Sequence, residues 1–142
     1  MEWNRHNEYK FESLIDVLNI RLREEIREEK GGTYGVRASF RISRIPDNTY
    51  TINLSWGCSP DRVEELVKAM YETIDNLKQN GPSAETLAKV KETQRRGRET
   101  SSKLNNFWTG VLFNYLLYNE DPEVVLDYNN WIEALTAEDI KE

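Results

Sequence analysis

A change of hydrophobic period across two glycines constrains the fold of this chain more than any other feature. From residue 11 to residue 30, apolar side chains recur at helical spacing. From residue 34 to residue 45, apolar and polar side chains alternate, which is typical of a strand with one buried face. Gly31 and Gly32 lie between the two segments, and glycine accepts the left-handed conformation in which many helices end. The sequence therefore predicts a helix that turns sharply into a strand.

The strand is followed by a second one. Pro46-Asp47-Asn48 is a typical turn, and residues 50 to 56 alternate again, which predicts an antiparallel hairpin. Only these two strands can be found, and an isolated hairpin is marginally stable without further sheet. The hairpin and the helical patterns on either side of it indicate an α+β fold.

The remaining residues predict helices. Ser59-Pro60 resembles a cap followed by proline at the first helical position, and the apolar stripe behind it runs to Leu77. A long helix is expected from about residue 84 into the hundreds, and a short one after Asp121-Pro122. Residues 136 to 139 resemble the start of a capping box, shortly before the chain stops. We therefore expect the chain to be a piece of a larger protein.

Composition narrows the classes of partner. The length of 142 residues fits one domain, and a net charge of −6 disfavours nucleic acid because an acidic protein repels polyphosphate at long range. No apolar run approaches the roughly 18 residues that a membrane span needs. Cys58 is the single cysteine, so an internal disulfide is excluded. A chain with one cysteine is compatible with the cytoplasm and with the cell envelope or periplasm of a bacterium.

The usual catalytic constellations are missing. His6 is the single histidine and is expected to be exposed near the N-terminus, so neither a zinc site nor a histidine-based catalytic set can be assembled around it. No glycine-rich phosphate loop is present. Cys58 is expected to be a small buried hydrophobic residue at a strand end. The sequence predicts that this fragment alone has no catalytic residues, no metal and no cofactor.

Two other segments have alternative interpretations. The basic cluster Arg95-Arg96-Gly97-Arg98 is either a solvated helical face that is balanced by Glu92 and Glu99, a contact surface for another domain or a peptide, or a nucleic-acid site. The aromatic stretch from residue 107 to residue 118 is apolar on every side of a helix, which is typical of a buried helix. Its alternative is a cleft wall that receives substrate side chains.

Arg27 and Tyr34 are the candidate site residues. They lie seven residues apart on either side of the two glycines, so the corner can bring a guanidinium and a phenol side by side. Both groups donate hydrogen bonds, which suits a grip on a peptide carbonyl or a developing oxyanion. The alternative is structural: Arg27 complements the negative end of the helix dipole, and Tyr34 is an ordinary strand aromatic.

The residues of this corner also resemble a known family. Residues 20–36, Ile-Arg-Leu-Arg-Glu-Glu-Ile-Arg-Glu-Glu-Lys-Gly-Gly-Thr-Tyr-Gly-Val, resemble the hallmark of the pitrilysin and insulysin family of zinc metallopeptidases. The weaker similarities lie downstream, in residues 57–66, 80–87, 106–108 and 128–139. The catalytic motif His-x-x-Glu-His is absent from the chain, so it resembles the non-catalytic, C-terminal half of such an enzyme.

The resemblance implies a fold and a role. It implies the α/β module shared by pitrilysin and mitochondrial processing peptidase, an antiparallel sheet backed by helices, of which residues 1–142 would be a single-domain fragment truncated at both ends. It also implies that a substrate peptide binds between this domain and a zinc-binding catalytic domain of the same parent protein. It further implies that Arg27 and Tyr34 reach the bound peptide near the scissile bond. Two alternatives stay open: a proteolytically inactive structural or assembly subunit of the same fold, and a protein- or nucleic-acid-binding module.

Overall fold

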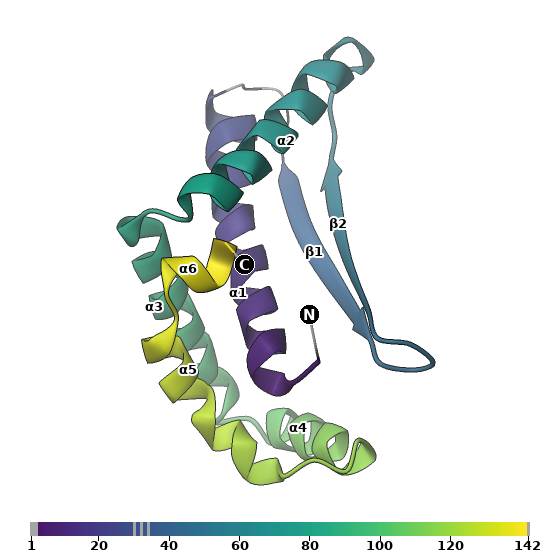
Figure 1. Ribbon diagram of the computed structural model, residues 1–142, viewed down its shortest axis with the longest axis vertical. Coiled ribbons are helices and arrows are strands. Elements are labelled where there is room, and N and C mark those ends of the chain that lie inside the picture. The colour runs from purple at the N-terminus through teal and green to yellow at the C-terminus, as the bar shows by residue number, and fades with distance from the viewer. Residues whose placement is uncertain (1–2, 30, 32, 34, 142) are drawn as a thin grey trace. The chain divides into compact units, whose positions relative to one another are not determined.

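A computed structural model describes residues 3–29, 31, 33 and 35–141 of the chain (Figure 1). The chain divides into two compact units. The first consists of residues 1–87 together with residues 136–142, and the second of residues 88–135. Among the helices that the structure describes, none has both the length and the apolar character needed to cross a membrane.

The first unit is built around helix α1 (Arg5–Leu22). The helix begins earlier than the apolar period predicts, because the side chain of Asn4 accepts a 2.7 Å hydrogen bond from the backbone N–H of Asn7 and caps it. After Leu22 the backbone widens into a π-helical segment, η1 (Arg23–Glu29), where the sequence predicted continuous α-helix. Leu22 and Ile26 are fully buried, so the predicted apolar face is confirmed.

The predicted hairpin is present. Strands β1 (Val36–Ser43) and β2 (Thr49–Trp56) pair antiparallel, with Ala38 opposite Leu54, and they form a two-stranded sheet within the described part of the chain. Phe11 of α1 packs edge-on against two rings of the hairpin, Phe40 and Tyr50, with ring centroids 5.5 Å apart in each pair. These contacts fix the hairpin against the helix.

Two further helices pack on α1 (Figure 1). Helix α2 (Val63–Asn80) follows a single 3₁₀ turn, η2 (Pro60–Arg62), and buries Leu66, Met70 and Leu77. The short helix α6 (Ala137–Lys141) contacts both α1 and α2. Its predicted capping box is confirmed, because the Asp139 carboxylate accepts from the backbone N–H of Thr136 at 2.8 Å and the Asp139 N–H donates to the Thr136 hydroxyl at 3.2 Å.

The second unit is helical. Helix α3 (Ala84–Ser101) begins in the first unit and continues into the second, which also contains α4 (Asn105–Leu117), the 3₁₀ segment η3 (Pro122–Asp127) and α5 (Tyr128–Ala134). Its buried apolar residues are Val90, Tyr115, Val125, Ile132 and Leu135. The α+β class, with an antiparallel sheet backed by helices, is therefore as predicted.

Two predictions of burial were wrong. Helix α4 was expected to be buried because it is apolar on every side, yet Tyr115 is its one buried residue. Cys58 was expected to be buried at the end of β2, and it is half-buried instead. His6 is exposed, as expected, but it lies within α1. Apolar composition therefore identified these segments without showing how much of each the fold covers.

Candidate functional site

The corner between α1 and β1 is held by one side-chain amide. Asn19 donates to the Ala38 carbonyl at 2.9 Å and to the Ile15 carbonyl at 3.0 Å, and its Oδ1 accepts from the Ala38 N–H at 2.8 Å. The amide therefore meets both backbone polar groups of Ala38, as a neighbouring strand would. These two hydrogen bonds between Asn19 and Ala38 fix the end of α1 relative to the start of β1.

The π-helical segment η1 carries Arg27 out of the core. Ile26 has none of its surface exposed, whereas Arg27 beside it is exposed. Arg27 makes no hydrogen bond or ion pair with another described residue. By contrast, Arg21 is paired with Glu24 at 3.1 Å and with Glu25 at 2.8 Å. π-helical backbone is rare and is frequently found at functional sites, and Arg27 lies in the last turn of this seven-residue segment.

The second candidate residue, Tyr34, lies outside the described residues. Between it and Arg27, Gly31 has φ +58°, a conformation that glycine adopts without strain. Apart from its two chain neighbours, no described residue has an atom within 4 Å of a Cβ built at Gly31. The left-handed conformation predicted at this glycine is therefore present, while the distance between the guanidinium and the phenol stays a prediction.

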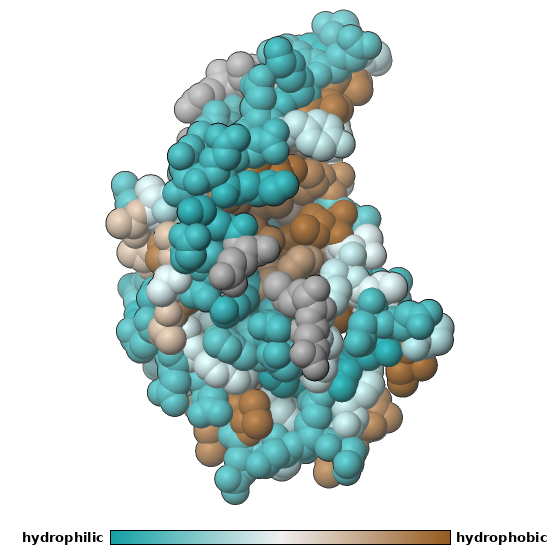
Figure 2. Space-filling model, viewed as in Figure 1, coloured by the Kyte–Doolittle hydropathy of each residue, from teal (hydrophilic) through white to brown (hydrophobic). Residues whose placement is uncertain are grey.

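An apolar groove runs over the same unit. It has a volume of about 420 Å³, and side chains from α1, β2, α2 and α6 line it: Leu14, Leu18, Ile52, Leu54, Ile74, Leu77, Lys78, Ile140 and Lys141. Figure 2 shows hydrophobic residues gathered on this face of the first unit. Among the apolar residues of this lining, Ile52 is the exposed one, although it lies on the apolar face of the hairpin. The hairpin therefore presents an incompletely covered apolar face to the groove.

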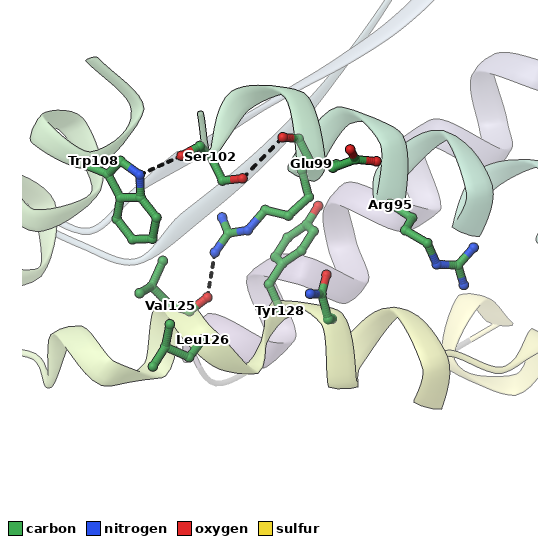
Figure 3. A pocket seen from close by; sticks show the side chains of 9 residues that line it. Arg95, Glu99, Ser102, Trp108, Val125, Leu126 and Tyr128 are labelled. Atoms are coloured by element: carbon green, nitrogen blue, oxygen red, sulfur yellow. Dashed lines mark hydrogen bonds between the residues drawn. The ribbon is translucent and has the colours of Figure 1, made fainter. Parts of the chain in front are cut away.

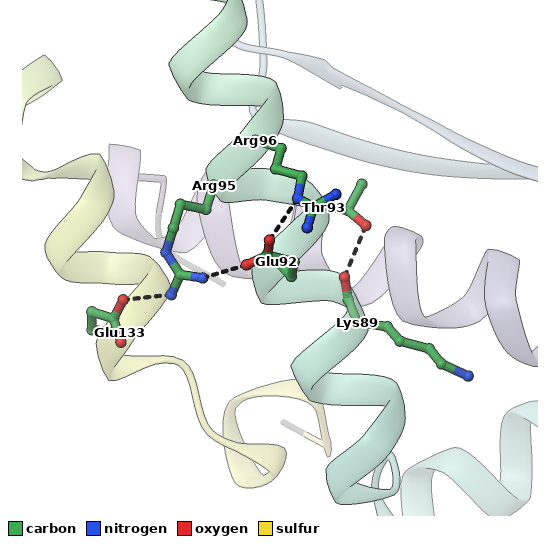
Figure 4. A network of polar contacts seen from close by, with 6 residues as sticks. All are labelled: Lys89, Glu92, Thr93, Arg95, Arg96 and Glu133. Atoms are coloured by element: carbon green, nitrogen blue, oxygen red, sulfur yellow. Dashed lines mark hydrogen bonds and ion pairs between the residues drawn. The ribbon is translucent and has the colours of Figure 1, made fainter.

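The basic cluster is largely neutralised (Figure 4). Arg95 contacts Glu92 at 2.8 Å and Glu133 of α5 at 2.6 Å, and Arg96 contacts Glu92 at 2.6 Å. These bonds to arginine lower the pKa of the carboxyl groups of Glu92 and Glu133. The pairing supports the interpretation of a solvated helical face for Arg95 and Arg96, and it leaves little free charge for nucleic acid.

The chemistry of the described residues does not fit a metal. Across residues 3–29, 31, 33 and 35–141, no three histidine, cysteine, aspartate or glutamate side chains are grouped so that they could hold an ion. A zinc site needs about four such ligands, or three and a water.

Comparison with known families decides the identity of the fold. The model of the peptidase M16 inactive domain matches residues 3–94, which include α1, η1, the hairpin, α2 and the first part of α3. The chain belongs to the peptidase M16 inactive domain family. The resemblance drawn from residues 20–36 is thereby confirmed, together with its assignment to the inactive half of a zinc protease.

Individual relatives agree with the family. A zinc protease PQQL-like protein of Arabidopsis thaliana is 27% identical over 97 residues, which are 65% of this chain and 10% of that protein. Among solved structures, the periplasmic protease PqqL of Escherichia coli gives a TM-score of 0.81 at 19% identity, covering 99% of this chain and 16% of that one. A peptidase M16 inactive domain of Pseudomonas fluorescens gives 0.74 at 22% identity, covering 92% and 32%.

These shares define how much of a relative the chain represents. This M16 chain spans about a tenth of the curated relative and about a third or less of the two solved structures. The solved structures therefore support the fold. The family match covers the Arg27 corner, whereas most of the second unit lies beyond it.

Proposed function

We propose that this inactive M16 domain grips a peptide substrate opposite the zinc site of a metalloendopeptidase and helps to stabilise the tetrahedral intermediate. The gripping residues are Arg27 and Tyr34. The observation that carries the proposal is the corner itself. There an exposed arginine without a partner among the described residues lies in the last turn of a π-helical segment, which follows a helix hydrogen-bonded to β1 through Asn19. A helix end fixed in this way positions its donors before substrate binds, which is what transition-state stabilisation requires.

The chemistry of the two side chains suits this role. A guanidinium is permanently cationic and carries five N–H donors in a planar fork, so it can bind a carbonyl oxygen or an oxyanion. A phenol adds one O–H donor and no charge at neutral pH. Together they stabilise negative charge that develops on the scissile carbonyl oxygen.

The metal chemistry belongs to another domain of the parent protein. We propose as partner a zinc-binding catalytic domain of the same polypeptide, and we propose that residues 1–142 are part of a single domain of that parent. The small share of each relative that the chain covers supports both statements. The apolar groove of the first unit and the exposed apolar residues of helix α4 supply area for contact with other parts of such a protein.

The test uses the full-length parent protein with a fluorogenic peptide substrate. Arg27→Ala and Tyr34→Phe should each lower kcat by roughly 100- to 1,000-fold, because each removes one transition-state donor, with a much smaller change in KM. Arg23→Ala is the matched control, since Arg23 lies exposed at the start of the same π segment. Thermal melting must show that all three variants keep the fold.

Two results would overturn the proposal. Wild-type turnover in both Arg27→Ala and Tyr34→Phe would exclude a role for the corner in catalysis. Failure of the wild-type parent to hydrolyse any peptide in a diverse library, although it binds zinc, would favour the structural or assembly subunit instead.

A further inference from the structure

A pocket in the second unit lies outside the part of the chain that the family model matches. It has a volume of about 350 Å³ and is formed by the end of α3, the start of α4, η3 and α5 (Figure 3). Trp108, Val125, Leu126 and Tyr128 supply its apolar walls, and Arg98 and Asn129 are among its polar residues. We infer that this pocket binds the carboxylate of an acidic side chain in a polypeptide, with Arg98 as the cationic anchor.

Arg98 is held in place by the pocket walls. Its guanidinium carbon lies 4.6 Å from the ring centre of Phe107 and 4.7 Å from that of Tyr128, so the group contacts two aromatic faces. One terminal nitrogen donates a 2.5 Å hydrogen bond to the Val125 carbonyl (Figure 3). The guanidinium is therefore fixed in orientation before any ligand arrives.

The charge of Arg98 is not balanced within the described residues. No carboxylate pairs with it, in contrast to Arg95, whose partners are Glu92 and Glu133. Glu99 also lines the pocket and would repel an anion, but it is paired with Lys103 at 2.9 Å. Arg98 thus supplies the excess positive charge of the pocket.

Arg98 is half-buried, and a half-buried charge without an ionic partner is energetically unfavourable. Partial desolvation lowers the pKa of the Arg98 guanidinium from its ordinary value, yet an arginine stays cationic at neutral pH. Of its five N–H donors, one is engaged by Val125. An anion that enters the pocket would restore the lost solvation and accept from the remaining donors, and such charge-assisted bonds are the stronger kind.

The surroundings favour one monovalent carboxylate on an apolar segment. One unbalanced guanidinium beside Glu99 in a protein of net charge −6 is a poor site for a phosphate dianion. The Asn129 amide, which has no hydrogen bond to another described residue, can donate to the second carboxylate oxygen. Leu126, with 68% of its surface exposed, offers apolar contact to the residues on either side of the acid.

The test is a titration of the 142-residue chain labelled with ¹⁵N. The probes are a capped tripeptide with glutamate between two leucines, the same peptide with glutamine, sodium acetate and inorganic phosphate. The glutamate peptide should shift the indole N–H of Trp108, which donates to the Ser102 carbonyl at 2.7 Å, and the side-chain amide of Asn129. The glutamine peptide should bind roughly 10-fold or more weakly, because hydrogen bonds to charged groups contribute about 1.5–3 kcal/mol.

Variants separate Arg98 from general surface charge. Arg98→Gln should abolish the shifts, and Arg96→Gln, which removes a more exposed arginine from the same helix, should leave them unchanged. If Arg98→Gln does not fold, Arg98→Lys serves instead: it keeps the charge but loses the planar fork, and it should weaken binding of the glutamate peptide.

The remaining outcomes overturn the inference. Equal binding of the glutamate and glutamine peptides would show that no carboxylate is recognised. Binding of acetate as tightly as the peptide would make the site one for free small carboxylates, and tighter binding of phosphate would assign it to another anion. None of these results depends on peptide hydrolysis, so failure here is distinguishable from failure of the Arg27 and Tyr34 proposal.

Discussion

Asn19 and Ala38 exchange two hydrogen bonds, one in each direction, across 19 positions of sequence. The side-chain amide of a helical residue here satisfies the backbone N–H and C=O of a strand residue at the free edge of β1. Because an unpaired strand edge is a template for association with other chains, the amide also blocks that edge at its most buried residue. The same contact places the π segment and Arg27 at the end of a fixed helix.

Replacing Asn19 with alanine should destabilise the fold. The change leaves two polar groups of Ala38 without partners in a half-buried setting, and each such loss costs about 1–3 kcal/mol. We expect the free energy of unfolding in urea to fall by about 2 kcal/mol or more. Asn76→Ala is the control, because Asn76 is exposed on α2 and alanine is the better helix former, so its stability should be unchanged or slightly raised. Equal effects of the two variants would contradict the role assigned to Asn19.

Local patterns predicted the elements of this fold well, and long-range contacts escaped prediction. The hairpin, the apolar face ending at Ile26 and the Thr136–Asp139 capping box each follow from residues close in sequence. The Asn19 contact could not be predicted, because an asparagine inside a helical pattern carries no signal of the strand that it meets. The same is true of the π-helical turn, which leaves the hydrophobic period unbroken.

The candidate site was predictable only in part. The spacing of Arg27 and Tyr34 around the two glycines pointed to the corner, and exposure of Arg27 is consistent with that interpretation. The Arg98 pocket could not be predicted, because Arg98 lies in a basic run of sequence that also contains Arg95 and Arg96. These three arginines lie within four positions and look alike in sequence. One of the contacts that distinguish them joins Arg95 to Glu133, which lies 38 positions away.

Two glycines should respond to alanine with opposite signs. Gly81 ends α2 with φ +70°, and a Cβ there would lie 3.3 Å from the Ala137 carbonyl oxygen. Gly81→Ala should therefore lower the free energy of unfolding by more than about 1 kcal/mol. Gly97 lies inside α3, and a Cβ there would meet nothing within 4 Å. Gly97→Ala should raise stability by about 0.5–1 kcal/mol. Denaturant unfolding of both variants checks the two predictions. If both variants change the free energy of unfolding in the same direction, one of the predictions is wrong.

The Lys10–Asp139 ion pair should make stability depend on pH in acid. Burial raises the pKa of Asp139, but hydrogen bonds from Lys10 at 2.5 Å and from Thr136 outweigh it and hold the pKa at about 2, below its ordinary 3.8. A carboxyl group with a depressed folded-state pKa stabilises the fold at higher pH, and this contribution is lost as the pH falls from about 4 to about 2. Since one pKa unit is about 1.4 kcal/mol, the half-buried pair should contribute about 1–2 kcal/mol.

Asp139→Asn should remove that part of the pH dependence. The variant should be less stable than the wild type at pH 6 and approach it near pH 2, as measured by thermal melting over that range. Asp75→Asn, at an exposed position of α2, is the matched control and should leave the curve unchanged. A wild-type advantage that is constant from pH 6 to pH 2 would show that the ion pair does not titrate as described.

The exposed apolar face of α4 should matter for association and little for stability. Leu116 has 74% of its surface exposed, so Leu116→Lys removes few intramolecular contacts and should change the free energy of unfolding by less than about 0.5 kcal/mol. It should also reduce concentration-dependent self-association, measured by light scattering, because exposed apolar surface is what drives such association. Ile132, with 1% exposed, is the contrast: Ile132→Ala should cost about 2–5 kcal/mol through the cavity that it leaves. If Leu116→Lys destabilises the fold as much as Ile132→Ala does, α4 is covered in solution and its face is part of the core.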